Sequence, residues 1–237
     1  MGIKIIFLLF IFYSFLGWLM EVTCKLIQYK RFINRGFLMG PICPIYGHGA
    51  IIMLILLKDF ASNPFILFVM SMLVCTTLEY LTSYFMEKLF SARWWDYSNK
   101  KFNINGRVCL RNTLCFGILA IVLVYFLNPF ILTYIEKITE PFLSILFYTL
   151  LVVYIIDNII SYSIINNFSS TIKKSNYDNT EEVTKYVKDV FLKKNYLSKR
   201  LIYAYPNFQT RVRRKLAKIK EALGEQMSNI SVKYLTF

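Results

Sequence analysis

Residues 112–135 form a stretch of 24 residues without a charged side chain. A helix of about 20 mainly apolar residues crosses the hydrocarbon core of a bilayer, so this stretch is long enough to span a membrane. The composition agrees, because 56% of all residues are hydrophobic, 17% are aromatic and the mean hydropathy is +0.46. These values exclude an ordinary soluble domain.

The hydropathy pattern predicts an all-α membrane bundle of five spans, near residues 3–27, 44–57, 64–90, 108–127 and 141–165. Lys58 and Asp59 cut the second segment short, and a re-entrant segment is the alternative there. A cleaved signal peptide is the alternative for the first segment, but no small-x-small cleavage site follows it. We expect a transmembrane domain over residues 1–168 and a basic, helical cytoplasmic tail over 169–237.

The positions of lysine and arginine predict the orientation of these spans. With five spans, ten basic residues fall in the links after the first and third helices: Lys25, Lys30, Arg31, Arg35, Lys88, Arg93, Lys100, Lys101, Arg107 and Arg111. The opposite side holds only Lys4, Lys58 and Lys137. Short cytoplasmic links carry the excess of such residues, which predicts the N-terminus outside and the C-terminus in the cytoplasm.

Three acidic residues, Glu21, Glu79 and Asp157, lie inside these apolar segments. A charge in a bilayer costs at least about 2.5–3.5 kcal/mol, so it normally has a partner or a function. At about 1.5 Å per residue, each lies about 9–12 Å from the cytoplasmic end of its helix. Other ionisable groups expected in this leaflet are Arg35, His48 and Arg111.

Two interpretations of these ionisable groups in one leaflet stay open. The carboxylates either tie helices together through Arg35 or Arg111, or they line a cavity that meets a ligand, ion or proton. Asp157 is the least certain of the three, since Asn158 is able to rotate into its place.

The link from Asn34 to Gly49, NRGFLMGPICPIYGHG, holds four glycines and two prolines. Irregular backbone at membrane depth persists only when it is buried in protein or lines a wet cavity. Pro44 suits the first turn of a helix, whose positive dipole end would then face the cavity. A rigid turn without a binding role is the alternative.

The link ARWWDYSNKKFNINGRVCLRN, residues 92–112, is rich in aromatic and basic side chains. Trp94, Trp95 and Tyr97 fit an interfacial aromatic belt, and we favour that interpretation for Trp94. The polar residues Asp96, Asn103 and Arg107 fit a cap that folds back over the cavity.

Several chemistries have no sequence support. The five cysteines form no CxxC pair, and His48 is the only histidine, so we expect neither a metal site nor a cofactor. The chain also lacks the phosphate-binding loop GxxxxGK[ST], so it does not hydrolyse ATP by that route. An enzyme is therefore the less favoured class.

The tail from Ser169 onward holds fifteen of the 28 basic residues and six acidic ones. Thr180 starts one expected helix, and residues 207–224 form a second, basic and amphipathic helix. Such a helix next to a span is typical of binding to anionic lipid. Nucleic acid is not an expected partner, because positive-inside bias and this helix account for most of the net charge of +14.

Four motifs in order resemble those of the Putative ABC-transporter type IV family of bacterial membrane proteins: YSFLGWLMEV, NRGFLMGPICPIYGHG, LEYLTSYFMEKLF and WWDYSNKKFNINGRVCLRNTLCFG. They cover most of residues 10–120, and RLIYAYPNF, residues 200–208, is similar to the family's tail. The chain departs from the family at His48, where an aromatic residue is usual. Residues inside the matching motifs are Glu21, Arg35, Glu79, Trp95, Asp96 and Asn103.

The resemblance implies a multi-pass permease subunit of the bacterial cell membrane, with a separate ATPase as a possible partner. A membrane-embedded enzyme is the second hypothesis, with Glu21 or Glu79 as acid or base and Arg35 gripping an anionic lipid head group. A scaffold without a substrate is the third. The substrate itself is not readable from the sequence.

Overall fold

The computed structural model describes residues 2–175 and 179–210, and within them the chain is a helical bundle. Four of its helical stretches are long and apolar enough to cross a membrane. They are α1 (Ile3–Tyr29), α3 (Pro64–Phe90), the continuous stretch Leu110–Ile135, and α6 (Glu140–Lys174). A shorter apolar helix, α2 (Pro44–Leu56), lies between α1 and α3 in the chain.

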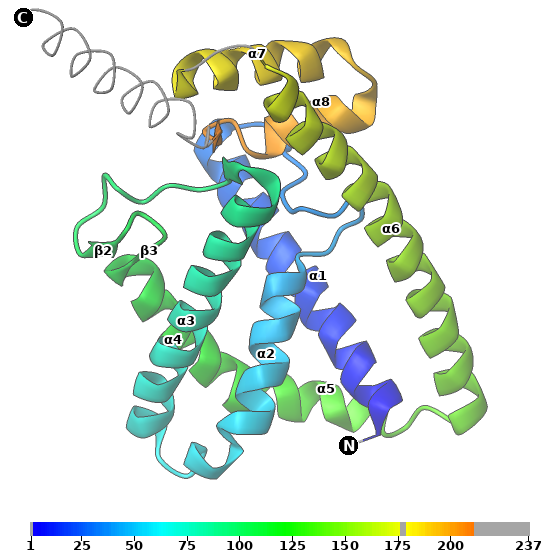
Figure 1. Ribbon diagram of the computed structural model, residues 1–237. Coiled ribbons are helices and arrows are strands. Elements are labelled where there is room, and N and C mark those ends of the chain that lie inside the picture. The colour runs from blue at the N-terminus through cyan, green and yellow to red at the C-terminus, as the bar shows by residue number, and fades with distance from the viewer. Residues whose placement is uncertain (1, 176–178, 211–237) are drawn as a thin grey trace, which may run out of the picture.

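The five helices alternate in direction (Figure 1). A 3₁₀ turn, η1 (Lys58–Phe60), leads from α2 to α3 at the end of the bundle that holds the N-terminus. There Pro64 occupies the first turn of α3, and the Asn63 side chain accepts hydrogen bonds from the Phe65 and Ile66 amides. Both features favour a helix start, and they explain why α3 begins immediately after the turn.

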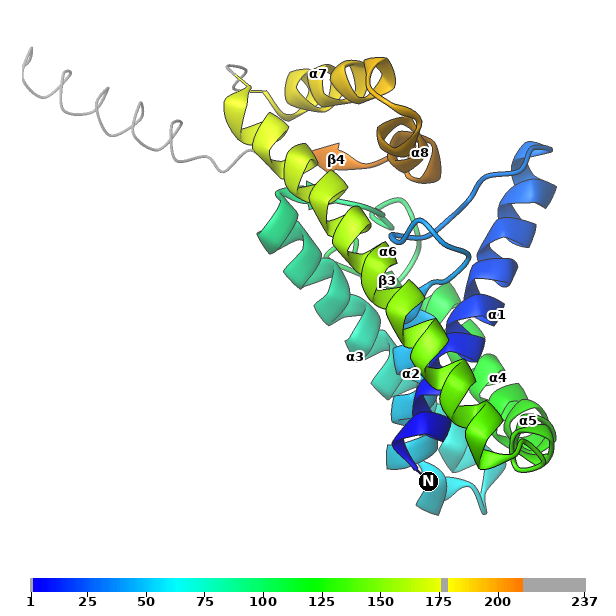
Figure 2. The same ribbon diagram turned by 90° about the vertical axis from the view of Figure 1, so that its right-hand side faces the viewer.

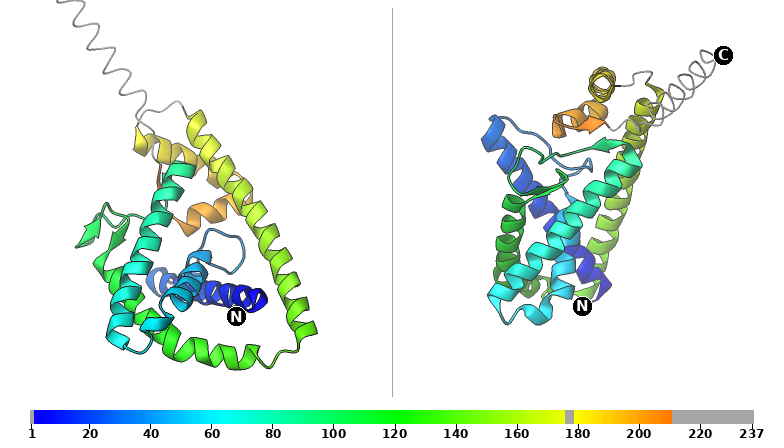
Figure 3. Two further views of the ribbon diagram at one scale, coloured as in Figure 1. Left: turned by 60° about the horizontal axis from the view of Figure 1, so that its bottom comes forward. Right: turned by 60° about the vertical axis from the view of Figure 1, so that its left-hand side comes forward.

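The fourth stretch is longer than the expected span of 108–127. It starts as α4 (Leu110–Val122), passes through a π-helical turn, η2 (Leu123–Leu127), and continues as α5 (Asn128–Ile135). Pro129 has no amide hydrogen to donate to the preceding turn, and a wide turn before it allows the helix to continue in a new direction. Figure 3 shows α5 crossing the end of the bundle toward α6.

Glycine allows α1 and α2 to pack closely. A Cβ atom at Gly17 would lie 2.3 Å from the Tyr46 ring, and one at Gly47 would lie 2.1 Å from Ser14 Oγ. Small residues at such crossings let membrane helices approach each other. The close approach brings the first turn of α2 against the middle of α1.

The helices α7 (Thr180–Lys193) and α8 (Tyr196–Ala204) cover the other end of the bundle, which we call the capped end (Figure 2). After α8 the short strand β4 (Gln209–Thr210) pairs antiparallel with β1 (Ala92–Arg93), which follows α3. A second pair, β2 (Asn103–Ile104) with β3 (Val108–Cys109), forms a hairpin before α4. The tail is thus joined to the link after α3.

One apolar core holds the capped end together. Its fully buried members include Phe168 from α6, Val187 and Phe191 from α7, and Ile202 from α8. The boundary that we expected at residues 168/169 falls inside α6, which runs without a break to Lys174. Trp94 is also part of this core, with 4% of its surface exposed. The interpretation of Trp94 as an interfacial belt residue is therefore wrong.

The basic amphipathic helix expected over residues 207–224 lies outside the described residues from position 211 onward. Within the described part of the tail, the apolar side of α7 faces protein, because Val183 and Val187 are fully buried in the core of the capped end.

Candidate functional site

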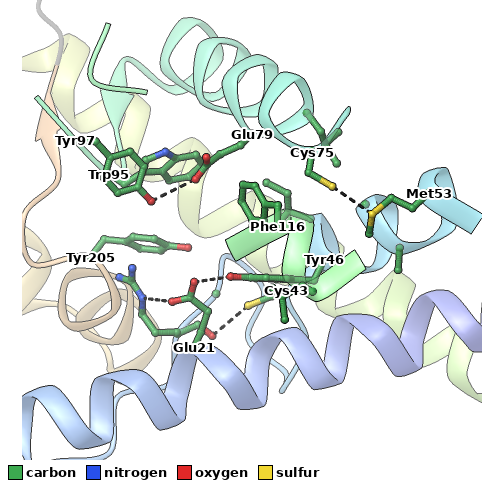
Figure 4. Close-up of a pocket in the computed structure, with 17 residues that line it drawn as sticks. Glu21, Cys43, Tyr46, Met53, Cys75, Glu79, Trp95, Tyr97, Phe116 and Tyr205 are labelled. Atoms are coloured by element: carbon green, nitrogen blue, oxygen red, sulfur yellow. Dashed lines mark hydrogen bonds and ion pairs between the residues drawn. The ribbon is translucent and has the colours of Figure 1, made fainter. Parts of the chain in front are cut away.

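A cavity of about 170 Å³ lies between α1, α2, α3 and α4, beneath the capped end, and its mainly apolar wall carries several polar side chains. Its ionisable and hydroxyl-bearing lining residues are Glu21, Arg35, Cys43, Tyr46, Cys75, Glu79, Tyr97 and Tyr205. The volume is large enough for several water molecules or a small solute. Figure 4 shows these side chains converging from segments that are far apart in the sequence.

Glu21 on α1 forms the centre of one side of the cavity. Tyr46 donates a 2.8 Å hydrogen bond to Glu21 Oε1, and Arg35 Nε lies 3.4 Å from Glu21 Oε2. Arg35 also donates to the Ala204 carbonyl oxygen, and its guanidinium carbon lies 4.9 Å from the centre of the Tyr205 ring. The charge of Glu21 is therefore balanced by a cation from the chain itself.

Glu79 on α3 forms the other side, and its surroundings differ. Only 7% of the residue is exposed. Its Oε1 accepts hydrogen bonds from the Tyr97 hydroxyl at 3.3 Å and from Asn112 Nδ2 at 3.5 Å. Among the residues that the structure describes, Glu79 Oε2 has no hydrogen-bond partner, and no arginine or lysine forms an ion pair with Glu79. A buried carboxylate without a counter-charge is costly unless it takes up a proton or a cation.

Two tyrosines outside the apolar helices keep their protons. Burial raises the pKa of Tyr97 above its usual range, and the Glu79 carboxylate raises it further. Burial likewise raises the pKa of Tyr205 to about 12, although the charge of Arg35 acts in the opposite direction. Both phenols are therefore neutral at physiological pH, and each presents a hydroxyl group that is able to donate a hydrogen bond.

Aromatic and sulfur-containing side chains complete the walls. The indole nitrogen of Trp95 donates to the Arg107 carbonyl oxygen at 3.0 Å, which fixes the orientation of its ring. Phe116 from α4 lies opposite, and the Cys75 thiol lies 3.5 Å from the Met53 sulfur. Because Trp95 and Tyr97 both line the cavity, the link after α3 covers the cavity like a lid at these positions.

Asp157 does not line this cavity. Its carboxylate accepts hydrogen bonds from the amides of Met39 at 2.7 Å and Gly40 at 2.8 Å, and from the Ser161 hydroxyl. Asn158 instead donates to the Tyr154 carbonyl oxygen of its own helix. Asp157 therefore anchors the irregular link between α1 and α2 to α6, at one end of a separate, apolar cavity of about 610 Å³.

Asp96 and Asn103 shape the lid itself. Asp96 Oδ1 accepts from the amide and hydroxyl of Ser98, and Asn103 Nδ2 donates to the Ser98 and Lys100 carbonyl oxygens. The Asn103 side-chain oxygen accepts from the amide of Gly106, which has a φ of +66°. These contacts fold the segment 96–106, and neither side chain lines the cavity.

Arg107 takes part in a buried charge cluster at the end of α3. Its Nη2 lies 3.1 Å from Glu87 Oε2, which Arg93 Nε also approaches to 3.0 Å. The Arg107 guanidinium also lies over the rings of Tyr80 and Tyr84. This cluster holds the lid against α3, and Arg107 reaches the cavity only through its carbonyl contact with Trp95.

The remaining two predicted site residues lie away from the cavity. His48 is exposed, its Nδ1 lies 2.7 Å from the Pro44 carbonyl oxygen, and its ring packs against Phe10. Arg111 is exposed near the start of α4. Of the nine predicted residues, the structure thus brings together Glu21, Arg35 and Glu79 in the cavity.

Four residues important to this geometry were not among the predicted ones: Tyr46, Tyr97, Tyr205 and Arg200. Arg200 on α8 is buried and donates through Nη2 to the carbonyl oxygens of Gly36 and Leu38. The stretch RLIYAYPNF contains both Arg200 and Tyr205. Its similarity to the family tail was the sequence feature from which these two residues could have been predicted.

Within residues 2–175 and 179–210, no three histidine, cysteine, aspartate or glutamate side chains come close enough to hold a metal ion. The cavity instead offers isolated carboxylates, phenols and aromatic rings. Such a lining suits hydrogen bonding and charge balance with a small polar or charged molecule.

Comparison with known proteins places these features in a family. No curated protein and no solved structure matches the chain. The family described as Putative ABC-transporter type IV matches residues 8–162, which is more than half of the 237 residues and includes the helices that supply Glu21, Tyr46 and Glu79. The chain is therefore a membrane protein that belongs to the Putative ABC-transporter type IV family.

Proposed function

We propose that this protein is a permease-type subunit of the bacterial cell membrane whose cavity holds a small solute at the cytoplasmic side. The observation that carries the proposal is the cavity between apolar helices, with Glu79 buried in its wall and one carboxylate oxygen unpartnered among the described residues. Polar groups at membrane depth are costly and mark substrate or ion pathways.

The proposal includes five membrane crossings with the capped end in the cytoplasm. The alternating helix directions support it, as do the ten basic residues in links at the capped end. At about 1.5 Å per residue, the 13 residues of α2 cover about 20 Å, less than the roughly 30 Å of a hydrocarbon core. The partly buried link before α2 would fill the remaining depth, since irregular backbone is tolerated there when protein surrounds it.

Energy for transport would come from another chain. The family description points to association with other subunits such as an ATPase, and this sequence carries no phosphate-binding loop. The capped end is the surface we assign to such a partner, because α7 and α8 would project into the cytoplasm.

The contacts that Arg35 already makes within the chain disfavour the alternative of an enzyme acting on anionic lipids. Arg35 already contacts Glu21, the Ala204 carbonyl oxygen and the Tyr205 ring. Gripping a head group would require breaking these contacts, and a partly buried ion pair that loses one partner leaves an uncompensated charge.

Metabolite profiling of a deletion strain tests the proposal. We expect one or more small solutes to change their distribution between cells and medium. Expression of the wild-type protein or of the Glu136→Gln variant should restore the distribution, since Glu136 is exposed and directly follows α5, which lies at the end of the bundle opposite the capped end. Expression of Glu21→Gln or Glu79→Gln at equal protein levels should not.

Two outcomes would contradict the proposal. One is an unchanged solute distribution in the deletion strain under every growth condition tested. The other is full restoration by both cavity variants, which would reduce the carboxylates to structural ties and favour a scaffold.

A further inference from the structure

The two sides of the cavity share a carboxylate, a tyrosine and aromatic rings, and they differ in their charge balance. On each side a carboxylate accepts a tyrosine hydroxyl: Glu21 from Tyr46, and Glu79 from Tyr97. Each side also has aromatic rings in its wall. Beside Glu21 the chain supplies a cation, Arg35, which lies between that carboxylate and the Tyr205 ring. Among the described residues, no cation of the chain forms an ion pair with Glu79.

The side chains that line the cavity supply too little positive charge on the Glu79 side. Glu21 and Arg35 cancel each other, so an ionised Glu79 would give the cavity a net charge of −1. Glu79 is 7% exposed, which leaves little solvent to stabilise that charge. Its free oxygen, Oε2, is fully buried and without a hydrogen-bond partner among the described residues. A ligand in the cavity that carries a positive charge would balance the charge of this carboxylate.

The walls around Glu79 are aromatic. The rings of Trp95, Tyr97 and Phe116 line the same cavity as Glu79 (Figure 4). Cations bind to aromatic ring faces, tryptophan best of all, and such cages recognise organic ammonium groups. The contact of Arg35 with Tyr205 is an example of this chemistry within the same cavity.

The lining suits an organic cation better than a bare metal ion or an anion. Calcium takes six to eight oxygen ligands and magnesium keeps an octahedral shell, whereas no three metal-binding side chains converge within the described residues. An anion would face Glu79 without a free cation to hold it. An ammonium group needs only one carboxylate and the ring faces.

We propose that the cavity binds a small organic cation, an amine or quaternary ammonium group, with the Glu79 carboxylate as its counter-ion and Trp95 and Phe116 as its aromatic walls. This inference rests on the proposed function for the statement that the bound cation is a transported solute. The binding site itself stands on the geometry alone.

Binding of methylammonium and tetramethylammonium to the purified full-length protein in lipid nanodiscs tests the inference. Titration calorimetry measures the affinity in the wild-type protein, and tryptophan fluorescence in a variant that carries Trp18→Phe and Trp94→Phe reports on Trp95, since the chain has three tryptophans. We expect saturable binding of at least one of these cations, and no saturable binding of the uncharged tert-butanol. Acidification should weaken the binding, because a proton competes for Glu79.

Glu79→Gln keeps the shape of the side chain and removes its charge, so it should weaken cation binding at least about tenfold. Glu136→Gln makes the same chemical change at an exposed position and should leave the affinity within about twofold. Phe116→Leu removes one ring and should weaken binding about threefold or more. Phe116→Leu provides a test of the site if Glu79→Gln fails to fold.

The inference is overturned if the wild-type protein binds neither cation saturably, or if Glu79→Gln and Phe116→Leu both bind as tightly as Glu136→Gln. The outcomes also separate this inference from the proposed function. If the deletion strain redistributes only anionic or neutral solutes, the transport proposal stands. The statement that the transported solute is an organic cation is then refuted. Cation binding without any solute redistribution would support the site and refute transport.

Discussion

The Tyr46 hydroxyl donates a 2.8 Å hydrogen bond to Glu21, and the ring that carries it lies directly over Gly17. Gly17 is one helical turn before Glu21 on α1. Tyr46 therefore packs its ring on α1 and donates its hydroxyl to the cavity carboxylate on the same face of that helix. The position of the hydroxyl therefore depends on how closely α2 approaches α1.

Gly17→Ala should disrupt this contact. The new Cβ atom would lie 2.3 Å from the Tyr46 ring, and a real structure does not hold such a distance. Overpacking of this kind costs about 1–3 kcal/mol, which an SDS titration of the purified protein would measure as a loss in the free energy of unfolding.

Gly49→Ala provides the matched control on α2. Its Cβ would lie 3.6 Å from Leu78 Cδ2, an ordinary contact, and alanine favours a helix over glycine by about 0.5–1 kcal/mol. We expect unchanged or slightly higher stability. Equal losses in the two variants would show that α1 and α2 do not pack as described.

Arg200→Met should destabilise the link between α1 and α2. The carbonyl oxygens of Gly36 and Leu38 would lose the guanidinium that donates to them. Leaving such buried groups unpaired costs about 1–3 kcal/mol, and the thermal unfolding midpoint in detergent should fall. Lys193→Met, at an exposed position on α7, should change the midpoint little. A similar fall in this variant would show that the contacts of Arg200 with the link do not account for the effect.

Asp157→Asn should loosen the same link from the side of α6. An asparagine presents one acceptor oxygen, so its amide group would face one of the two backbone donors, Met39 or Gly40. We expect a loss of about 1.5–3 kcal/mol and faster labelling of the Cys43 thiol, which is 6% exposed.

Asn158→Ala is the neighbouring control for Asp157→Asn. Its side chain donates to the Tyr154 carbonyl oxygen within α6, a local contact, so the loss should stay below about 0.5 kcal/mol. If Cys43 labels at the wild-type rate in Asp157→Asn, then Asp157 does not hold the link.

Reporter fusions test the orientation. A reporter that is active only in the cytoplasm should work when fused after Lys101, in the link at the capped end. A reporter that is active only outside should work after Asp59, in the turn between α2 and α3. Cytoplasmic activity at Asp59 would contradict five crossings and revive the re-entrant alternative for α2.

The prediction that residues 207–224 bind anionic lipid remains, because most of this segment lies outside the described residues. A peptide of this sequence should gain helicity on anionic vesicles, gain less on neutral ones, and lose affinity as salt rises. Helix formation only with a purified ATPase would instead identify a partner-docking segment.

The apolar helices were predictable because each rests on a local property of the sequence. Long runs without charge identified α1, α3 and α6. The fourth helix was predicted too short, since Pro129 is usually a helix breaker and the compensating wide turn over Leu123–Leu127 has no sequence signature. The end of α2 was readable from Lys58 and Asp59.

The cavity was only partly predictable. Glu21, Arg35 and Glu79 stood out because charge is costly among apolar residues. Tyr46, Tyr97 and Tyr205 did not, because tyrosine is common in membrane proteins and its role depends on which distant segments meet. Trp94 was misread for a related reason: a tryptophan near a helix end suits both an interfacial belt and a core, and only the position of the tail decides between them.

The placement of Trp94 has a mechanical consequence. Its ring lies 5.2 Å from Tyr205 and 6.4 Å from Phe208, while its neighbour in the chain, Trp95, lines the cavity. Packed interiors transmit displacement because they have little free volume. A push on α7 or α8 would thus move two walls of the cavity together, Tyr205 directly and Trp95 through the backbone.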